Sequence, residues 1–257
     1  MGIFNKYLVM KNLFIFFLVF CAVNTSAQVG YLPRESFEGA AYTLAVHEVN
    51  FEGVQNASKL RLPYSSVKGS PFFIDEFLWA TFYDKKGKIT GKQKAKINLA
   101  SQEIHFIGEK EMEYIAPVEL ANRVVLSHDQ KNDTVAVFAR LVPGLQFNNK
   151  PLSDYVQQLT FGEAVLYKHT KRYVASADSM FGTLKRYYFA SQNSYFLKFD
   201  ADPVFVNKLS LNTLLSILPD SNGLLDWAKK NKINIRREDD LIALIEEWNK
   251  TAGRKKQ

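Results

Sequence analysis

Two adjacent carboxylates, Asp75 and Glu76, stand among aromatic residues at Phe72, Phe73 and Phe77. Paired carboxylates do acid–base chemistry in glycosidases, where they face each other across a cleft and have no fixed spacing in the sequence. An acidic pair in an apolar setting can also line a binding site, because burial and a nearby like charge shift a carboxyl pKa. We therefore name Asp75 and Glu76 as candidate binding residues, although a polar bend between two strands is the simpler explanation.

Recognised catalytic motifs are missing from the rest of the sequence. The pair Asp239-Asp240 is typical of a helix start, where the helix dipole favours acids, and Asp200-x-Asp202 is typical of a turn. The chain lacks the G-x-S-x-G elbow of hydrolases and both glycine-rich phosphate loops. We therefore predict no catalytic residue and no cofactor, and we expect a non-catalytic protein rather than an enzyme.

The histidines show none of the spacings that zinc sites use, such as H-x-H, H-E-x-x-H or H-x-x-x-H. We expect no structural zinc site and predict no metal ligand, although a site assembled from distant histidines stays open. His105 and His169 are expected to be ordinary strand residues. The other two histidines of the sequence are His47 and His128.

Residues 1–27 have the pattern of a secretory signal peptide. Lys6 and Lys11 supply the positive start, residues 13–23 (LFIFFLVFCAV) are apolar, and small residues precede Gln28. The apolar run is shorter than the ~20 residues that a spanning helix needs. We therefore expect an exported protein, periplasmic, outer-membrane-associated or secreted, with no transmembrane span in the mature chain.

The single cysteine of the chain, Cys21, lies in this leader. The mature protein is therefore expected to contain no disulfide and no thiol chemistry. Lipidation at Cys21 is disfavoured, because Phe20 stands where a lipidation site has a small residue.

The formal net charge of +7 belongs largely to the two ends of the chain. Two of the positive charges, Lys6 and Lys11, lie in the leader, and three more, Arg254, Lys255 and Lys256, lie at the end, so the rest carries +2. A nucleic-acid-binding protein gathers basic residues on one face. We therefore expect no nucleic-acid partner.

Residues 67–206 are predicted to form an antiparallel β-rich body that begins with a meander over 67–107. Alternating aromatic and β-branched residues at 77–83 favour a strand covered on both faces, and Lys92, Lys94 and Lys96 predict a strand with one solvent face. Further along, residues 175–183 are predicted to be a loop, and residues 191–194 (SQNS) a turn between two strands.

The flanking segments complete the predicted α+β, mainly β architecture. Residues 28–66 are expected to be an irregular lead-in with edge strands, and residues 207–250 a cap of about three short helices. Leu241, Leu244, Ile245 and Trp248 recur at helical spacing and are expected to dock on the sheet. Residues 251–257 are predicted to be a basic, disordered tail.

Two segments resemble a group of uncharacterised exported, β-rich proteins of Bacteroidetes. They are V-K-G-S-P-F-F-I-D-E-F at 67–77, followed by a K-x-G-K hairpin, and L-L-D-W-A-K-K-N-K-I-N-I-R-R-E-D-D-L-I-A-L at 224–244. The group has no assigned activity, so the resemblance implies a cell-envelope or secreted setting and no site residue.

The leading hypothesis is therefore a non-catalytic envelope or secreted binding module, whose partner could be an envelope protein or a glycan. A surplus of aromatic residues, 20 Phe, 12 Tyr and 3 Trp, is compatible with a patch that stacks on sugars or contacts a partner. The alternatives are a hydrolase acting on cell-envelope polymers and a carrier of an apolar ligand.

Overall fold

The computed structural model describes residues 43–51, 60–108, 111–129, 133–178, 185–200, 202–219 and 222–255. The predicted leader over 1–27, with Cys21, lies outside the described residues, as does most of the lead-in. The described part is mainly β, with one large antiparallel sheet and three C-terminal helices. The predicted α+β, mainly β class is confirmed.

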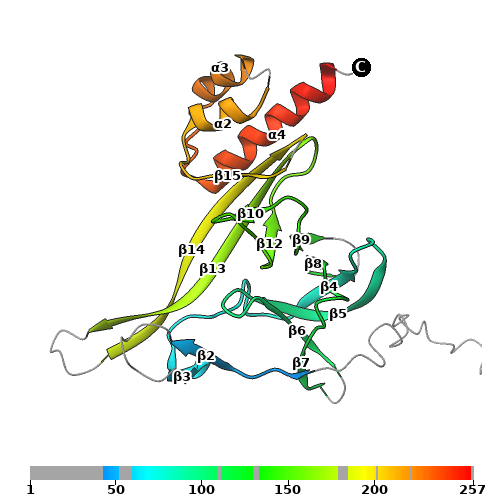
Figure 1. Ribbon diagram of the computed structural model, residues 1–257, viewed down its shortest axis with the longest axis vertical. Helices are drawn as coiled ribbons and strands as arrows, with labels where there is room; N and C mark the ends of the chain where they lie inside the picture. Colours follow the sequence, from blue (N-terminus) through cyan, green and yellow to red (C-terminus); the bar gives the residue numbers. More distant parts are fainter. Residues whose placement is uncertain are drawn as a thin grey trace, which may run out of the picture. The chain divides into compact units, whose positions relative to one another are not determined.

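The large sheet contains eleven strands of the described residues, in the order β1-β7-β6-β5-β4-β8-β9-β12-β13-β14-β15. All neighbouring pairs are antiparallel (Figure 1). The strand bounds are β1 Thr43–Leu44, β4 Leu78–Tyr83, β5 Ile89–Asn98, β6 Glu103–Ile107, β7 Glu113–Ile115, β8 Arg123–Ser127, β9 Thr134–Ala139, β12 Val156–Gln158, β13 Ala164–Asp178, β14 Lys185–Phe199 and β15 Val204–Val206.

Two small antiparallel pairs stand beside this sheet. β2 (Glu48–Phe51) pairs with β3 (Leu60–Pro63), which leads into the 3-10 helix η2 (Tyr64–Ser66). β10 (Gln146–Phe147) pairs with β11 (Lys150–Pro151). The lead-in thus supplies the edge strand β1 and the β2–β3 hairpin.

The meander consists of β4, β5 and β6, which are neighbours in the sheet. In β4 the side chains alternate, with Leu78, Ala80 and Phe82 buried and the residues between them half-buried. This alternation arises because successive side chains of a strand point to opposite faces. One face is therefore sealed and the other is only partly covered.

One lysine of β5 departs from the predicted solvent face. Lys92 and Lys94 are exposed, but Lys96 is buried. Its ammonium lies 4.0 Å from the ring centre of Phe72 and 4.4 Å from that of Phe77. Such cation–π contacts, together with an acidic partner across the sheet, offset the cost of removing this charge from water.

β13 and β14 are the longest strands, and here the predicted turn at 191–194 is wrong. The two strands pair without interruption from Ala164↔Phe199 to Asp178↔Lys185, so residues 191–194 lie inside β14. The loop predicted over 175–183 is also wrong as far as Asp178, and residues 179–184 lie outside the described part. Polar residues are tolerated here because the partner strand supplies their backbone hydrogen bonds.

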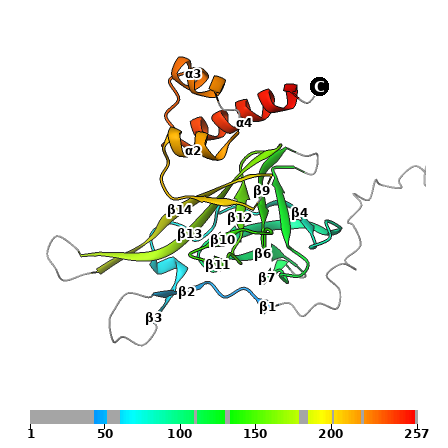
Figure 2. The same cartoon turned by 45° about the horizontal axis from the view of Figure 1, so that its top comes forward.

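Figures 1 and 2 show β13 and β14 as one ribbon that reaches from the helices to the β2–β3 hairpin. Near that hairpin, Lys68 forms a parallel bridge to Tyr188 of β14. The backbone of Lys68 accepts from the N–H of Phe189 and donates to the carbonyl of Tyr187.

The helices are α2 (Leu211–Ile217), α3 (Asn222–Lys230) and α4 (Glu238–Lys255). Ser210 caps α2, since its hydroxyl accepts from the N–H of Thr213, as Ser at an N-cap does. α4 continues to Lys255, so the disordered tail predicted over 251–257 is wrong as far as residue 255, and residues 256–257 lie outside the described part. The hydroxyl of Thr251 donates to the carbonyl of Trp248, and Ala, Arg and Lys are good helix formers, so the helix extends.

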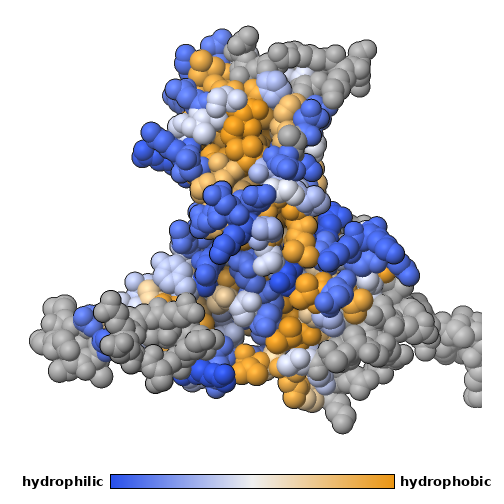
Figure 3. All heavy atoms as spheres, in the orientation of Figure 1, coloured by the Kyte–Doolittle hydropathy of each residue, from blue (hydrophilic) through white to orange (hydrophobic). Residues whose placement is uncertain are grey.

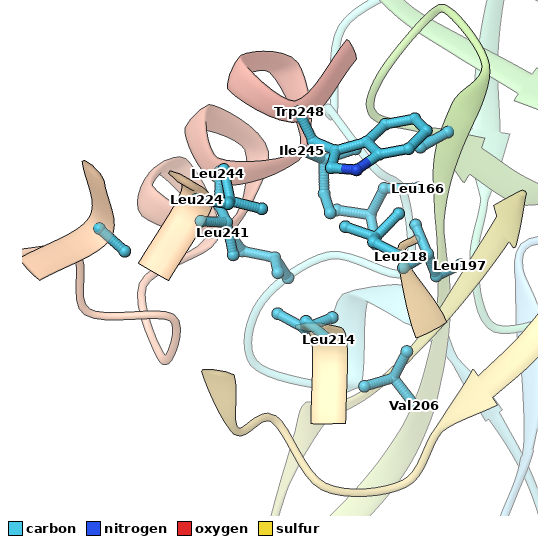
Figure 4. Packing of buried hydrophobic residues seen from close by; sticks show 12 residues of the cluster. Leu166, Leu197, Val206, Leu214, Leu218, Leu224, Leu241, Leu244, Ile245 and Trp248 are labelled. Carbon is cyan, nitrogen blue, oxygen red and sulfur yellow. The ribbon is translucent and has the colours of Figure 1, made fainter. Parts of the chain in front are cut away.

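The helices and the sheet share one apolar core, which Figure 4 shows from close by. The α4 residues predicted to dock on the sheet are buried, with exposures of 0–4%. They pack with Ala164 and Leu166 of β13 and Leu197 of β14, and Trp248 also meets Phe199 edge-on at 4.9 Å. The remaining buried members of this cluster are Val206, Leu214, Leu218, Leu224 and Ala228.

Candidate functional site

Asp75 and Glu76 lie in a bend between η2 and β4, and both are exposed. The bend is held by Arg172, whose Nη1 donates to the carbonyls of Ser70 and Phe72. Burial lowers the pKa of the Arg172 guanidinium, and the charge of Asp75 opposes that effect. The position matches the polar-bend explanation, and a binding role of the two acids stays a prediction.

A different polar cluster lies on one face of β5, β6 and β7. Lys96 pairs with His105 across β5 and β6, and His105 pairs with Ile115 across β6 and β7. Side chains repeat on one face every second residue, so Glu113 lies on the same face as Lys96 and His105. The register alone therefore places an ammonium, an imidazole and a carboxylate on one face of the sheet, with Glu113 as a diagonal neighbour of His105.

Glu113 is the centre of this cluster. Its Oε1 lies 2.6 Å from Nδ1 of His105 and 3.2 Å from Nε2 of His47, and its Oε2 lies 3.3 Å from Nζ of Lys96. Burial raises the pKa of Glu113, but His105, Lys96 and His47 together hold it below its ordinary value. The carboxylate is therefore charged at neutral pH, with one oxygen facing two imidazoles.

His47 reaches the cluster from the short segment between β1 and β2. The backbone fixes this segment on both sides, because Ala45 donates to the carbonyl of Glu113 and Tyr64 donates to that of His47. The imidazole stacks on the ring of Tyr64 at 5.8 Å and lies 6.3 Å from the ring of His105. Half of the His47 side chain, 52%, is exposed, so solvent reaches the cluster from its side.

His105 is fully buried and only one of its ring nitrogens has a hydrogen bond. Nδ1 meets Glu113, whereas the buried Nε2 has no hydrogen-bond partner among the described residues. Glu103 Oε2 lies 3.8 Å from this Nε2, which is an ion-pair distance rather than a hydrogen bond. The interaction with His105 is also the main reason that the pKa of Glu103 is lowered.

His47, His105 and Glu113 are the one group of three His, Cys, Asp or Glu residues in the described part whose ligand atoms lie within 4.8 Å of one another. Two imidazoles and a carboxylate can hold a transition-metal ion or pass a proton between them. Sequence motifs did not reveal the group because its members come from different segments. The alternation of charged and apolar residues in β5 and β6 was the available signal.

A second feature is an exposed face on the β13–β14 ribbon. Tyr173 pairs with Ala190, and Ala175 pairs with Tyr188, so the two tyrosines are diagonal neighbours on one face. Diagonal neighbours in a sheet are ~7–8 Å apart, within reach of aromatic rings. Tyr173 is 45% exposed and Tyr188 is 40% exposed.

Figure 3 shows one side of the structure, where orange hydrophobic patches alternate with blue hydrophilic side chains, one patch lying over the helices. Of the helices described, none has the length and apolar character to cross a membrane.

Comparisons of the chain with protein-family models, with curated proteins and with solved structures find no match. The resemblance to exported Bacteroidetes proteins therefore stays a prediction.

Proposed function

We propose that this chain is an exported, non-catalytic binding module that contacts a glycan through the exposed face of the β13–β14 ribbon. The observation that carries the proposal is the pair of solvent-facing tyrosines, Tyr173 and Tyr188, on adjacent strands. Flat aromatic side chains present a large apolar surface at low entropic cost, and the phenol oxygen adds a hydrogen-bonding group. A ribbon holds both rings in fixed relative positions.

The residues around the two tyrosines suit a polar ligand. Lys171 and Gln192 are cross-strand partners, and Arg186 is two residues from Tyr188, so all three lie on the same face. Their side chains are exposed. Ammonium, guanidinium and amide groups donate hydrogen bonds to hydroxyl and carboxylate oxygens, which are the polar groups of acidic and neutral sugars.

The proposal is tested by affinity electrophoresis in gels that contain soluble polysaccharides and by sedimentation with purified peptidoglycan. Tyr173→Ala and Tyr188→Ala are each expected to weaken binding about 10-fold, as loss of a contact worth ~1.4 kcal/mol does. Phe161→Ala, which removes a 58% exposed aromatic side chain outside the ribbon face, is the matched control. Equal loss in the control, or no binding by the wild type, refutes the glycan surface.

The same experiment separates the binding module from the alternative, a hydrolase of envelope polymers. Each bound polymer is recovered after overnight incubation and its reducing ends are counted. A binding module leaves the number unchanged. New reducing ends that disappear with Glu76→Gln or Asp75→Asn would establish the enzyme instead, because the hydrolase alternative places one of these candidate binding residues in a catalytic cleft.

A second candidate function is recruitment of an envelope protein at the outer edge of β15. This strand is the last of the described sheet, and Val204 and Phe205 are 49% and 40% exposed. Open edges accept a strand from another protein. A photo-crosslinker at 204 that captures one defined partner, while one at 212 on α2 does not, would support this function.

The export that the proposal includes has its own test. The support is the leader pattern over 1–27, with Lys6, Lys11 and the apolar run that follows. The protein recovered from the envelope or medium is expected to begin at Gln28. A chain recovered from the cytoplasm with residues 1–27 intact would refute export.

A further inference from the structure

We propose that His47, His105 and Glu113 form a binding site for Zn²⁺ or a similar divalent transition-metal ion. This inference does not depend on the proposed glycan surface, because none of its residues belongs to the ribbon face. Two histidines and one carboxylate are a ligand set that Zn²⁺ uses when it keeps one position open. Because His47 is half exposed, the open position faces solvent and would hold water.

The three ligand atoms lie within 4.8 Å of one another, as a shared metal ion requires. Donor atoms on a tetrahedral zinc ion are ~3.3 Å apart, given Zn–N and Zn–O bonds of ~2.0–2.1 Å. Nε2 of His47 and Oε1 of Glu113 are already 3.2 Å apart. Nδ1 of His105 is 2.6 Å from the same oxygen, which is the distance of a short hydrogen bond. An ion that takes the place of the hydrogen-bonding proton needs that pair to open by ~0.7 Å.

The two oxygens of Glu113 have separate partners, which leaves one of them for the metal. Lys96 contacts Oε2 and is held over the rings of Phe72 and Phe77. Oε1 therefore faces both histidines. The Lys96 contact also orients the carboxylate, as hydrogen-bonded groups behind metal ligands do.

The buried Nε2 of His105, which lacks a hydrogen-bond partner among the described residues, is the second observation that indicates a metal. A histidine that binds metal through Nδ1 carries its proton on Nε2 and donates that proton to a carboxylate behind it. In His105 this Nε2 is buried without a hydrogen bond, and Oε2 of Glu103 lies 3.8 Å away. Metal at Nδ1 would fix the tautomer that places a donor toward Glu103.

The scaffold restricts the ligands before any ion arrives. His105 is fully buried, and Glu113 is 16% exposed and lies on the adjacent strand. His47 is positioned by the Tyr64 N–H, which donates to the His47 carbonyl, and by stacking on the Tyr64 ring, and two residues before it the Ala45 N–H donates to the carbonyl of Glu113. A bound ion would join the β1–β2 segment to β6 and β7.

The test is isothermal titration of the tag-free protein with ZnCl₂, supported by the visible absorption of the Co²⁺ form. The wild type is expected to bind one equivalent, with Co²⁺ bands of a tetrahedral nitrogen–oxygen site. His47→Ala is expected to weaken Zn²⁺ at least ~100-fold, and Glu103→Gln ~10–100-fold, as loss of a group behind a ligand does. His128→Ala, at an exposed histidine in the β8–β9 connection, should leave binding unchanged.

His47→Ala is the decisive variant, because its side chain is half exposed and the fold does not depend on burying it. Circular dichroism checks that the variant keeps the wild-type spectrum. Absence of a stoichiometric site in the wild type overturns the proposal. So does an equal loss of affinity in His47→Ala and His128→Ala, which would assign binding to scattered surface histidines.

Discussion

The side-chain amide of Asn249 on α4 binds both backbone groups of Ala164, the first residue of β13. Its Oδ1 accepts from the Ala164 N–H at 2.8 Å, and its Nδ2 donates to the Ala164 carbonyl at 2.9 Å. Ala164 is fully buried, so these contacts satisfy backbone groups that water does not reach. The Asn249 side chain thus connects α4 to the start of β13 through two hydrogen bonds.

Asn249→Ala is expected to lower the free energy of unfolding by ~1–3 kcal/mol, because it leaves a buried donor unsatisfied. Urea unfolding followed by tryptophan fluorescence measures the change. Glu246→Ala, at an exposed position of the same helix, is the control and should stay within ~0.5 kcal/mol of the wild type. Similar values for the two variants would contradict a special role of Asn249.

Gly162 gives a second prediction at the same junction. Its φ is +135°, and a Cβ would lie 2.8 Å from Cγ of Asn249, so Gly162→Ala is expected to destabilise the protein. Gly223 on α3 has open space around it, and Gly223→Ala should stabilise by up to ~1 kcal/mol. Thermal unfolding of the two variants should shift in opposite directions; shifts of the same sign would argue against this geometry.

Leu244 tests the docking of the helices on the sheet. The side chain is fully buried in the cluster with Leu166 and Leu197. Leu244→Ala is expected to cost ~2–5 kcal/mol, since truncation loses apolar burial and leaves a cavity. Ile242→Ala removes a half-buried neighbour on α4 and should cost clearly less. Denaturant unfolding measures the loss of unfolding free energy in both variants. A larger loss in Ile242→Ala than in Leu244→Ala would contradict a core centred on Leu244.

Asp154 gives the pH prediction. Its Oδ2 lies 2.9 Å from Nε2 of His169, and this interaction is the main reason that the pKa of Asp154 is lowered. A carboxyl whose pKa is lower in the folded than in the unfolded state stabilises the fold above the unfolded pKa. That contribution is lost as pH falls through the folded pKa. The wild type should therefore lose stability on the acid side.

Asp154→Asn removes this contribution, so the stability gap between wild type and variant should be largest near neutral pH. The difference in stability should narrow at acid pH, below the ordinary pKa of an aspartate side chain. Urea melts between pH 3 and pH 7 measure the effect, with Asp226→Asn on the exposed side of α3 as control. A gap that stays constant with pH would show that the carboxylate charge does not matter.

Helices and short strands could be predicted from the sequence because their periods are local. The stripe of Leu241, Leu244, Ile245 and Trp248 repeats at helical spacing, and all four are buried. The turn at 191–194 was misread because Ser and Asn are common in turns, whereas the long partner strand β13 supplies hydrogen bonds that no local window contains. Pairing over such distances is set by tertiary structure.

The cluster around Glu113 could likewise be predicted only in part. His105 and Lys96 could be placed on one face from the alternation in their strands, once the β5–β6 pairing was assumed. Nothing local indicates that His47 returns to the same place, because its approach depends on the edge pairing of β1 with β7. The aromatic neighbours of Asp75 and Glu76 in the sequence suggest burial, but both side chains are exposed.

The position of the helices also bears on how a nascent chain matures on the ribosome. Leu166 and Leu197 are synthesised well before Leu241 and Ile245, which cover them. Until α4 has been synthesised, the apolar surface of the β13–β14 hairpin stays exposed. Exposed apolar surfaces of this kind promote aggregation, so premature termination before residue 238 should yield insoluble protein.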